Sequence, residues 1–177
     1  MAVRSIAALA LSLVLGGCEQ RQAVTGPSER AEAGPRCAPG ERPVYACAFK
    51  EKAVSVCATN RVVTYRYGAS GKIDLKITSN GSDGHAHLGT ARGPGGGGEQ
   101  TSLRFSNDGY EYIVYSAIGG TGTDVAGRHW SGLVVMKGGQ EISSVQCPAR
   151  GPAQRFTLDN APSFVADEDN SDYQAFF

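Results

Sequence analysis

The sequence lacks an excess of either charge sign. Its 177 residues include 17 Lys or Arg and 17 Asp or Glu, so the formal net charge is zero at pH 7. Binding to nucleic acid or to an anionic lipid surface depends on clustered positive charge, and no stretch of the chain is strongly basic. We therefore expect no nucleic-acid partner.

The chain also has no apolar run long enough for a transmembrane helix. Residues 5–17 are apolar, but this run is shorter than the ~20 residues that a spanning helix needs. One basic residue, Arg4, precedes the run, and two glycines end it. This arrangement is typical of a cleaved targeting segment, so we predict that residues 1–17 are a signal peptide.

Cys18 directly follows the run Leu15-Gly16-Gly17. This arrangement resembles the signal of bacterial lipoproteins, in which the cysteine becomes the first residue of the mature chain and carries lipid. The resemblance implies that Cys18 is the lipid attachment site and that more than one acyl chain anchors the protein stably to a membrane. In Gram-negative lipoproteins an Asp after the cysteine favours the inner membrane, so Glu19 favours the outer membrane, facing the periplasm.

Composition divides the rest of the chain into three parts. Residues 18–36 are polar, which predicts a flexible tether behind the lipidated cysteine. Residues 37–150 are expected to form one β-rich domain, since the mature length of 177 − 17 = 160 residues suits a single domain. Residues 151–177 contain a run of acidic side chains and are expected to be a flexible tail.

Helical periodicity is missing after residue 18, and short strands with turn signals take its place. In residues 72–78, Ile73, Leu75 and Ile77 alternate with polar residues, as in a half-buried strand. Asp108-Gly109 and Gly138-Gly139 each separate two such segments and predict hairpins. The pattern predicts an all-β fold, a single small antiparallel β-barrel or sandwich of about eight strands.

Four cysteines besides Cys18 are candidates for two disulfides, Cys37, Cys47, Cys57 and Cys147. Three pairings are possible. One joins Cys47 to Cys57, which lie in neighbouring predicted strands. We prefer to pair Cys57 with Cys147, and Cys37 with Cys47, because closing a long loop constrains the unfolded chain more. The even spacing of the first three cysteines lacks the close pairs typical of zinc sites.

Two Gly-rich segments, residues 79–100 and 117–130, are predicted to be long loops. Binding residues are concentrated on loops, so we take the second loop with the end of the preceding strand as a candidate partner-binding site. Its residues are Tyr115, Ser116, Gly119, Gly120 and Asp124. Two tyrosine pairs, Tyr65 with Tyr67 and Tyr110 with Tyr112, are expected to line the core rather than form a surface patch.

Catalytic motifs are also missing. The sequence has no Gly-x-Ser-x-Gly nucleophile turn and no phosphate-binding loop, which favours a protein that is not an enzyme and needs no cofactor. His85 and His87 are weak candidates for metal ligands, with Asp83 or His129 as a third, because imidazole binds zinc, copper and nickel. We expect both histidines to be exposed in a Gly-rich loop, and keep a metal-binding or hydrolytic protein as an alternative.

Several segments resemble a group of small exported bacterial proteins that are rich in β-structure. These segments are residues 48–50, 55–57, 65–68, 110–116, 132–135 and Cys147. The resemblance implies a fold but no activity. A more distant similarity is to periplasmic lysozyme inhibitors, whose Ser-Gly motif this chain does not match, since Ser116 precedes Ala117. The interpretation is an envelope lipoprotein that binds a protein partner, or else an accessory lipoprotein without a soluble ligand.

Overall fold

The computed structural model describes residues 36–92, 97–148, 156–163, 165 and 167–169. The predicted signal peptide, Cys18 and the tether up to residue 35 lie outside these residues, as does the end of the tail, residues 170–177. Within the described ranges, no helix is long and apolar enough to cross a membrane.

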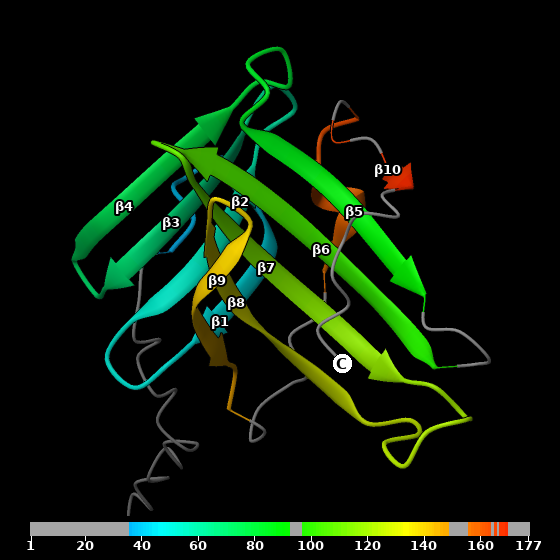
Figure 1. The fold of residues 1–177 in the computed structure, drawn as a ribbon. Coiled ribbons are helices and arrows are strands. Elements are labelled where there is room, and N and C mark those ends of the chain that lie inside the picture. The colour runs from blue at the N-terminus through cyan, green and yellow to red at the C-terminus, as the bar shows by residue number, and fades with distance from the viewer. Residues whose placement is uncertain (1–35, 93–96, 149–155, 164, 166, 170–177) are drawn as a thin grey trace, which may run out of the picture. The chain divides into compact units, whose positions relative to one another are not determined.

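Two β-sheets account for most of the described residues (Figure 1). The first has the order β1-β2-β3-β4 and is antiparallel throughout. The second has the order β10-β5-β6-β7-β8-β9, antiparallel except for the parallel pair β10 and β5. The strands are β1 (Arg42–Ala48), β2 (Ala53–Ala58), β3 (Val63–Ala69), β4 (Lys72–Ser79), β5 (Ala86–Arg92), β6 (Gly98–Asn107), β7 (Tyr110–Gly119), β8 (His129–Lys137), β9 (Gln140–Gln146) and β10 (Asp167–Asp169).

The predicted all-β class is confirmed, and the arrangement is sandwich-like. No closed barrel is formed by the described strands. The main core lies between the sheets, where Val56 and Tyr65 of the first sheet belong to one buried cluster with Leu103 and Phe105 of the second. Tyr65 is fully buried and its ring lies 5.3 Å from that of Phe105, as expected for a tyrosine that lines the core.

Both predicted hairpins are confirmed. Asp108 and Gly109 turn the chain between β6 and β7 with φ angles of 51° and 76°. Gly138 and Gly139 do the same between β8 and β9 with φ angles of 56° and 78°. Positive φ at both central residues matches the right-handed twist of the flanking strands, which is why these dipeptides are reliable turn signals.

Three expectations about local structure are wrong. The segment 79–100 is not one long loop, because it contains β5 and the start of β6. The segment 117–130 is shorter as a loop than expected, since β7 continues to Gly119 and β8 begins at His129. In β4, Ile77 is buried but Ile73 is 49% exposed, because a bulge opposite Gly68 interrupts the alternation between them.

The described part of the tail is packed rather than flexible. The amide of Thr157 donates to the carbonyl of Val44 at 2.9 Å, and the ring of Phe156 lies 4.9 Å from that of Tyr45. The short 3-10 helix η2 (Leu158–Asn160) follows, and β10 adds a parallel strand to the edge of β5. The sequence does not predict this packing, because one aromatic residue and a three-residue strand give little periodic signal.

All four predicted cysteines form disulfides, but the preferred pairing is wrong. The bonds join Cys37 to Cys57 and Cys47 to Cys147. Between β1 and β2, Cys47 lies opposite Val54 and Cys57 lies opposite Pro43, so Cys47 and Cys57 are not cross-strand partners. Cys47 belongs to the core cluster between the sheets, where it bonds to Cys147, the residue directly after β9. Cys57 does not belong to that cluster.

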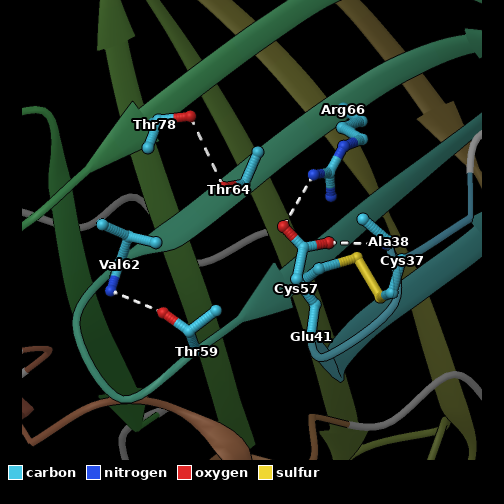
Figure 2. Close-up of polar contacts among 9 residues, drawn as sticks. All are labelled: Cys37, Ala38, Glu41, Cys57, Thr59, Val62, Thr64, Arg66 and Thr78. Carbon is cyan, nitrogen blue, oxygen red and sulfur yellow. Dashed lines mark hydrogen bonds and ion pairs between the residues drawn. A yellow bond between two sulfur atoms is a disulfide. The ribbon is translucent and has the colours of Figure 1, made fainter.

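Figure 2 shows how the segment before β1 is fixed to the first sheet. Beside the Cys37–Cys57 bond, the Arg66 guanidinium donates to the Glu41 carboxylate at 2.7 Å, and the Ala38 amide donates to its other oxygen at 2.7 Å. Burial alone would raise the pKa of Glu41, but the hydrogen bonds from Arg66 and Ala38 outweigh it and hold that pKa below its ordinary value. One covalent bond and one ion pair thus secure the point at which the predicted tether would join the domain.

Candidate functional site

The connection between β7 and β8, residues 120–128, is a loop held together by its own backbone; we refer to it as the β7–β8 loop. At its base the Gly119 amide donates to the Arg128 carbonyl, and the Gly127 amide donates to the Gly119 carbonyl, both at 2.8 Å. Inside the loop the Thr123 hydroxyl donates to the Gly120 carbonyl at 2.8 Å. These bonds give a surface loop a defined conformation before it meets any partner.

Gly119 allows the loop to fold back on the strand that it leaves. A Cβ atom placed on Gly119 would lie 2.0 Å from the carbonyl oxygen of Val125, closer than any side chain tolerates. The glycine is therefore required by a close backbone approach rather than by a positive φ. The loop's exposed residues include Thr121, Gly122 and Asp124.

The structure separates the predicted partner-binding residues into two groups. Gly120 and Asp124 belong to the loop and Asp124 is exposed, whereas Ser116 and Gly119 belong to β7. Tyr115, the strand-end residue of the predicted site, lies in β7 and only 2% of its surface is exposed, so its side chain is not accessible to a partner. Because side chains alternate along β7, Tyr115 lies on the same face as Ile113, and both pack with Val134 in a second buried cluster.

Beside the base of the loop, the inner face of the six-stranded sheet changes from apolar to polar. The strand register places side chains in rows across β6, β7 and β8, and opposed residues share a face. Two rows, Phe105–Tyr112–Val135 and Leu103–Val114–Leu133, belong to the core between the sheets. The next row carries three hydroxyls, Thr101–Ser116–Ser131, and the last row is Glu99–Ile118–His129.

All residues of these two rows except the buried Ser131 line a hollow of about 330 Å³, which we call the inner hollow. Phe156 and Leu158, from the segment between β9 and β10, supply an apolar wall. The size falls within the range of small-ligand sites, and a few polar groups beside an apolar wall are typical of such sites. In the sequence, Glu99 and His129 fall in segments expected to be loops. Their spacing of two residues from Thr101 and Ser131 is the one signal that places them on the same strand faces.

Tyr45 stiffens the sheet under this hollow. Its hydroxyl lies 3.2 Å from the carbonyl oxygens of both Tyr115 and Gly132, and thus donates to neighbouring strands of the second sheet from a strand of the first. Burial raises the pKa of Tyr45, so its hydroxyl stays protonated and remains a donor. Its ring contacts Phe156, which connects the wall of the hollow to the core.

His85 precedes β5 and is exposed, whereas His87 is the second residue of β5 and is half-buried, so the expectation that both histidines are exposed in a loop is wrong for His87. Nδ1 of His85 lies 2.8 Å from the Ser106 carbonyl and Nε2 of His87 lies 2.8 Å from the Gly84 carbonyl. Asp83 caps the preceding turn by accepting from Ser79 and from two amides. Within the described residues, the one group with the spacing of a metal site is Cys37, Glu41 and Cys57, whose two cysteines form a disulfide.

A second hollow of about 480 Å³ lies between the two hairpin turns. Two of its lining residues have partners: Glu111 accepts from Arg104 at 2.6 Å, and the Tyr110 hydroxyl accepts from Lys137 at 3.0 Å.

Comparison of the chain with protein-family models, with curated proteins and with solved structures finds no match.

Proposed function

We propose that this protein is a lipid-anchored protein of the bacterial envelope that is not an enzyme and that binds a protein partner through the β7–β8 loop. The observation that carries the proposal is the conformation of that loop, which is fixed by backbone hydrogen bonds at its base and presents Asp124 to solvent. A loop fixed in advance loses little conformational entropy on binding, so it can bind tightly through a small surface.

The location follows from the sequence. The lipoprotein-like signal ending at Cys18 supports a membrane anchor, and the two disulfides of the domain fit an oxidising compartment. Glu19 supports the outer membrane. A lysozyme is the first partner to test, because the chain has a distant resemblance to periplasmic lysozyme inhibitors. Those inhibitors are also small, disulfide-bonded, β-rich proteins.

Fractionation of cells that express the full chain tests the anchor. The wild-type protein is expected in the membrane fraction and to incorporate a labelled fatty acid, whereas Cys18→Ser is expected to lose the label and the membrane association. Continued membrane association and labelling of the Cys18→Ser variant would disprove an anchor at that residue.

Titration of the full chain in detergent tests the binding function. Lysozymes of several classes, and any protein captured from an envelope extract and then purified, are titrated against wild type, Asp124→Ala and Glu51→Ala. Glu51 is an exposed carboxylate in the turn between β1 and β2, so its loss matches the charge change at a site outside the loop. Saturable binding that only Asp124→Ala weakens supports the proposal; the absence of saturable binding leaves the accessory role as the better account.

A further inference from the structure

We propose that Asn80, in the turn between β4 and β5, is a self-modification site whose side-chain amide is converted to a carboxylate through a cyclic imide with the Gly81 backbone nitrogen. This inference goes beyond the proposed binding function and does not depend on it, since it rests on hydrogen bonds within residues 79–85. Asn80 is the only asparagine of the chain that precedes a glycine.

The reaction joins two groups that are neighbours in the chain. The Gly81 nitrogen attacks Cγ of Asn80, the new N–C bond closes a ring, and the side-chain nitrogen leaves as ammonia, taking up the proton that the Gly81 amide gives up. Water then opens the ring at either carbonyl and leaves aspartate or its isomer, in which the main chain runs through the side chain. Holding both groups in one chain favours such a ring closure. Glycine favours it further, because no Cβ atom obstructs the nitrogen.

Two donors already bind the carbonyl oxygen that becomes negative in this reaction. Oδ1 of Asn80 accepts from the Ser82 hydroxyl at 2.8 Å and from the Ser82 amide at 3.1 Å. The second bond is an Asx turn, in which the side chain accepts from the backbone two residues further on. When the Gly81 nitrogen attacks, negative charge develops on this oxygen, and donors aimed at such an oxygen lower the barrier.

The attacking nitrogen is bonded to a hydroxyl that is itself bonded to a carboxylate. The Gly81 amide donates to Oγ of Ser79 at 3.2 Å, and this hydroxyl donates to Oδ1 of Asp83 at 2.7 Å. The hydrogen bond from Ser79 lowers the pKa of Asp83, so the carboxylate is ionised at neutral pH and remains an acceptor. This series of bonds draws the amide proton away from the nitrogen, as the activation of a nucleophile requires.

The turn is open to solvent while its base is fixed. Residues 80–84 are exposed, so water reaches the ring and ammonia can leave. Ser79 is fully buried, and Asp83 also accepts from the amides of Asn80 and His85 at 3.2 and 3.0 Å. The turn carries the chain from the first sheet to the second, so the isomer with its longer main chain would alter that connection.

Peptide mapping by mass spectrometry of the full chain, incubated in detergent at neutral pH, tests the proposal. Loss of the amide at Asn80 is followed by the small increase in mass that it causes, and a synthetic peptide of residues 76–86 gives the rate without the fold. Because the fold supplies both the donors and the acceptor, we expect the folded protein to react at least about tenfold faster than the peptide.

Two variants test the two halves of the site. Ser82→Ala removes one donor to the Asn80 oxygen, and Ser79→Ala removes the hydroxyl between Gly81 and Asp83. Each is expected to slow the reaction of the folded protein about three- to tenfold, less than the loss of one donor costs in a buried enzyme site. The control Ser70→Ala removes an exposed hydroxyl from the turn between β3 and β4 and is expected to leave the rate unchanged.

Thermal unfolding shows that each protein compared is folded. A folded wild-type protein that reacts no faster than the peptide would overturn the proposal, because the turn would then protect Asn80 rather than activate it. The same slowing by Ser82→Ala in the protein and in the peptide would also overturn it, since the serine would then act without the fold.

Discussion

The Arg66 guanidinium holds the Glu41 carboxylate at 2.7 Å, and both side chains are largely buried, with 7% and 12% of their surfaces exposed. The carboxylate sits beside the Cys37–Cys57 disulfide (Figure 2), at the point where the predicted tether would enter the domain. A lipid-anchored protein transmits any pull from the membrane through this segment. The pair therefore links the proposed anchoring to the stability of the first sheet.

Replacing Glu41 with Gln is expected to destabilise the oxidised protein by about 2 kcal/mol, because a buried hydrogen bond to a charged group is lost. The effect should depend on pH. The pKa of Glu41 is lowered in the folded protein. The carboxylate therefore contributes its full stabilisation of the fold above the ordinary carboxyl pKa, and this contribution is lost as the pH falls through the lowered value. Denaturant unfolding of both proteins at neutral and acidic pH checks this; an unchanged difference between them across that range would contradict it.

The two buried tyrosines of the main core give a matched pair of predictions. The Tyr65 hydroxyl is buried and has no hydrogen-bond partner among the described residues, whereas the Tyr45 hydroxyl donates to backbone carbonyls. Tyr65→Phe is expected to stabilise the protein by up to ~1 kcal/mol, and Tyr45→Phe to destabilise it by ~1 kcal/mol. Chemical denaturation measures both; equal effects of the same sign would show that the hydroxyl environments do not differ as described.

The two disulfides are expected to contribute unequally. The Cys47–Cys147 bond spans 100 residues and the Cys37–Cys57 bond spans 20. In the chain-entropy model, loops of these sizes correspond to about 4–5 and about 3 kcal/mol of stabilisation. In denaturant unfolding, replacing both cysteines of the Cys47–Cys147 bond with Ala should therefore lower the free energy of unfolding more than replacing both cysteines of the Cys37–Cys57 bond. Mass spectrometry of unreduced peptides must first find these two bonds, and finding Cys57 joined to Cys147 would contradict the fold.

Gly119→Ala is expected to disturb the β7–β8 loop, because the added carbon would collide with the Val125 carbonyl. Moving that backbone should cost about 1–3 kcal/mol. Thr121→Ala, at an exposed position of the same loop, should leave stability unchanged. Hydrogen exchange at the Gly127 and Arg128 amides gives a local readout, since these amides donate to the Gly119 and Val125 carbonyls. Protection that persists in Gly119→Ala would argue against a required close approach.

The sequence predicts the parts of this fold that local chemistry determines. Asp108-Gly109 and Gly138-Gly139 specify their hairpins because few other residues adopt two consecutive positive φ angles. The disulfide pairing depends instead on strand register, which places Cys57 opposite Pro43, and register is set by contacts between residues far apart in the sequence. A preference based on loop length could not supply that information.

The candidate site shows the same division. Gly119, Gly120 and Asp124 could be chosen from the sequence because glycine clusters mark loops. Glu99, Ser116 and His129 meet only because three strands align in register, and Phe156 joins them only because the tail packs back on Tyr45. The burial of Tyr115 could not be predicted from the sequence, because it depends on packing against Val134 of the neighbouring strand.

The most direct measurement of the central claim is the dissociation constant of the full chain for its purified partner, taken for wild type, Asp124→Ala and the charge-matched Glu51→Ala. We expect Asp124→Ala to raise the constant by tenfold or more, about 1.4 kcal/mol, and Glu51→Ala to leave it within twofold of wild type. Equal constants for Asp124→Ala and Glu51→Ala, with all three proteins folded, would show that the β7–β8 loop does not bind the partner.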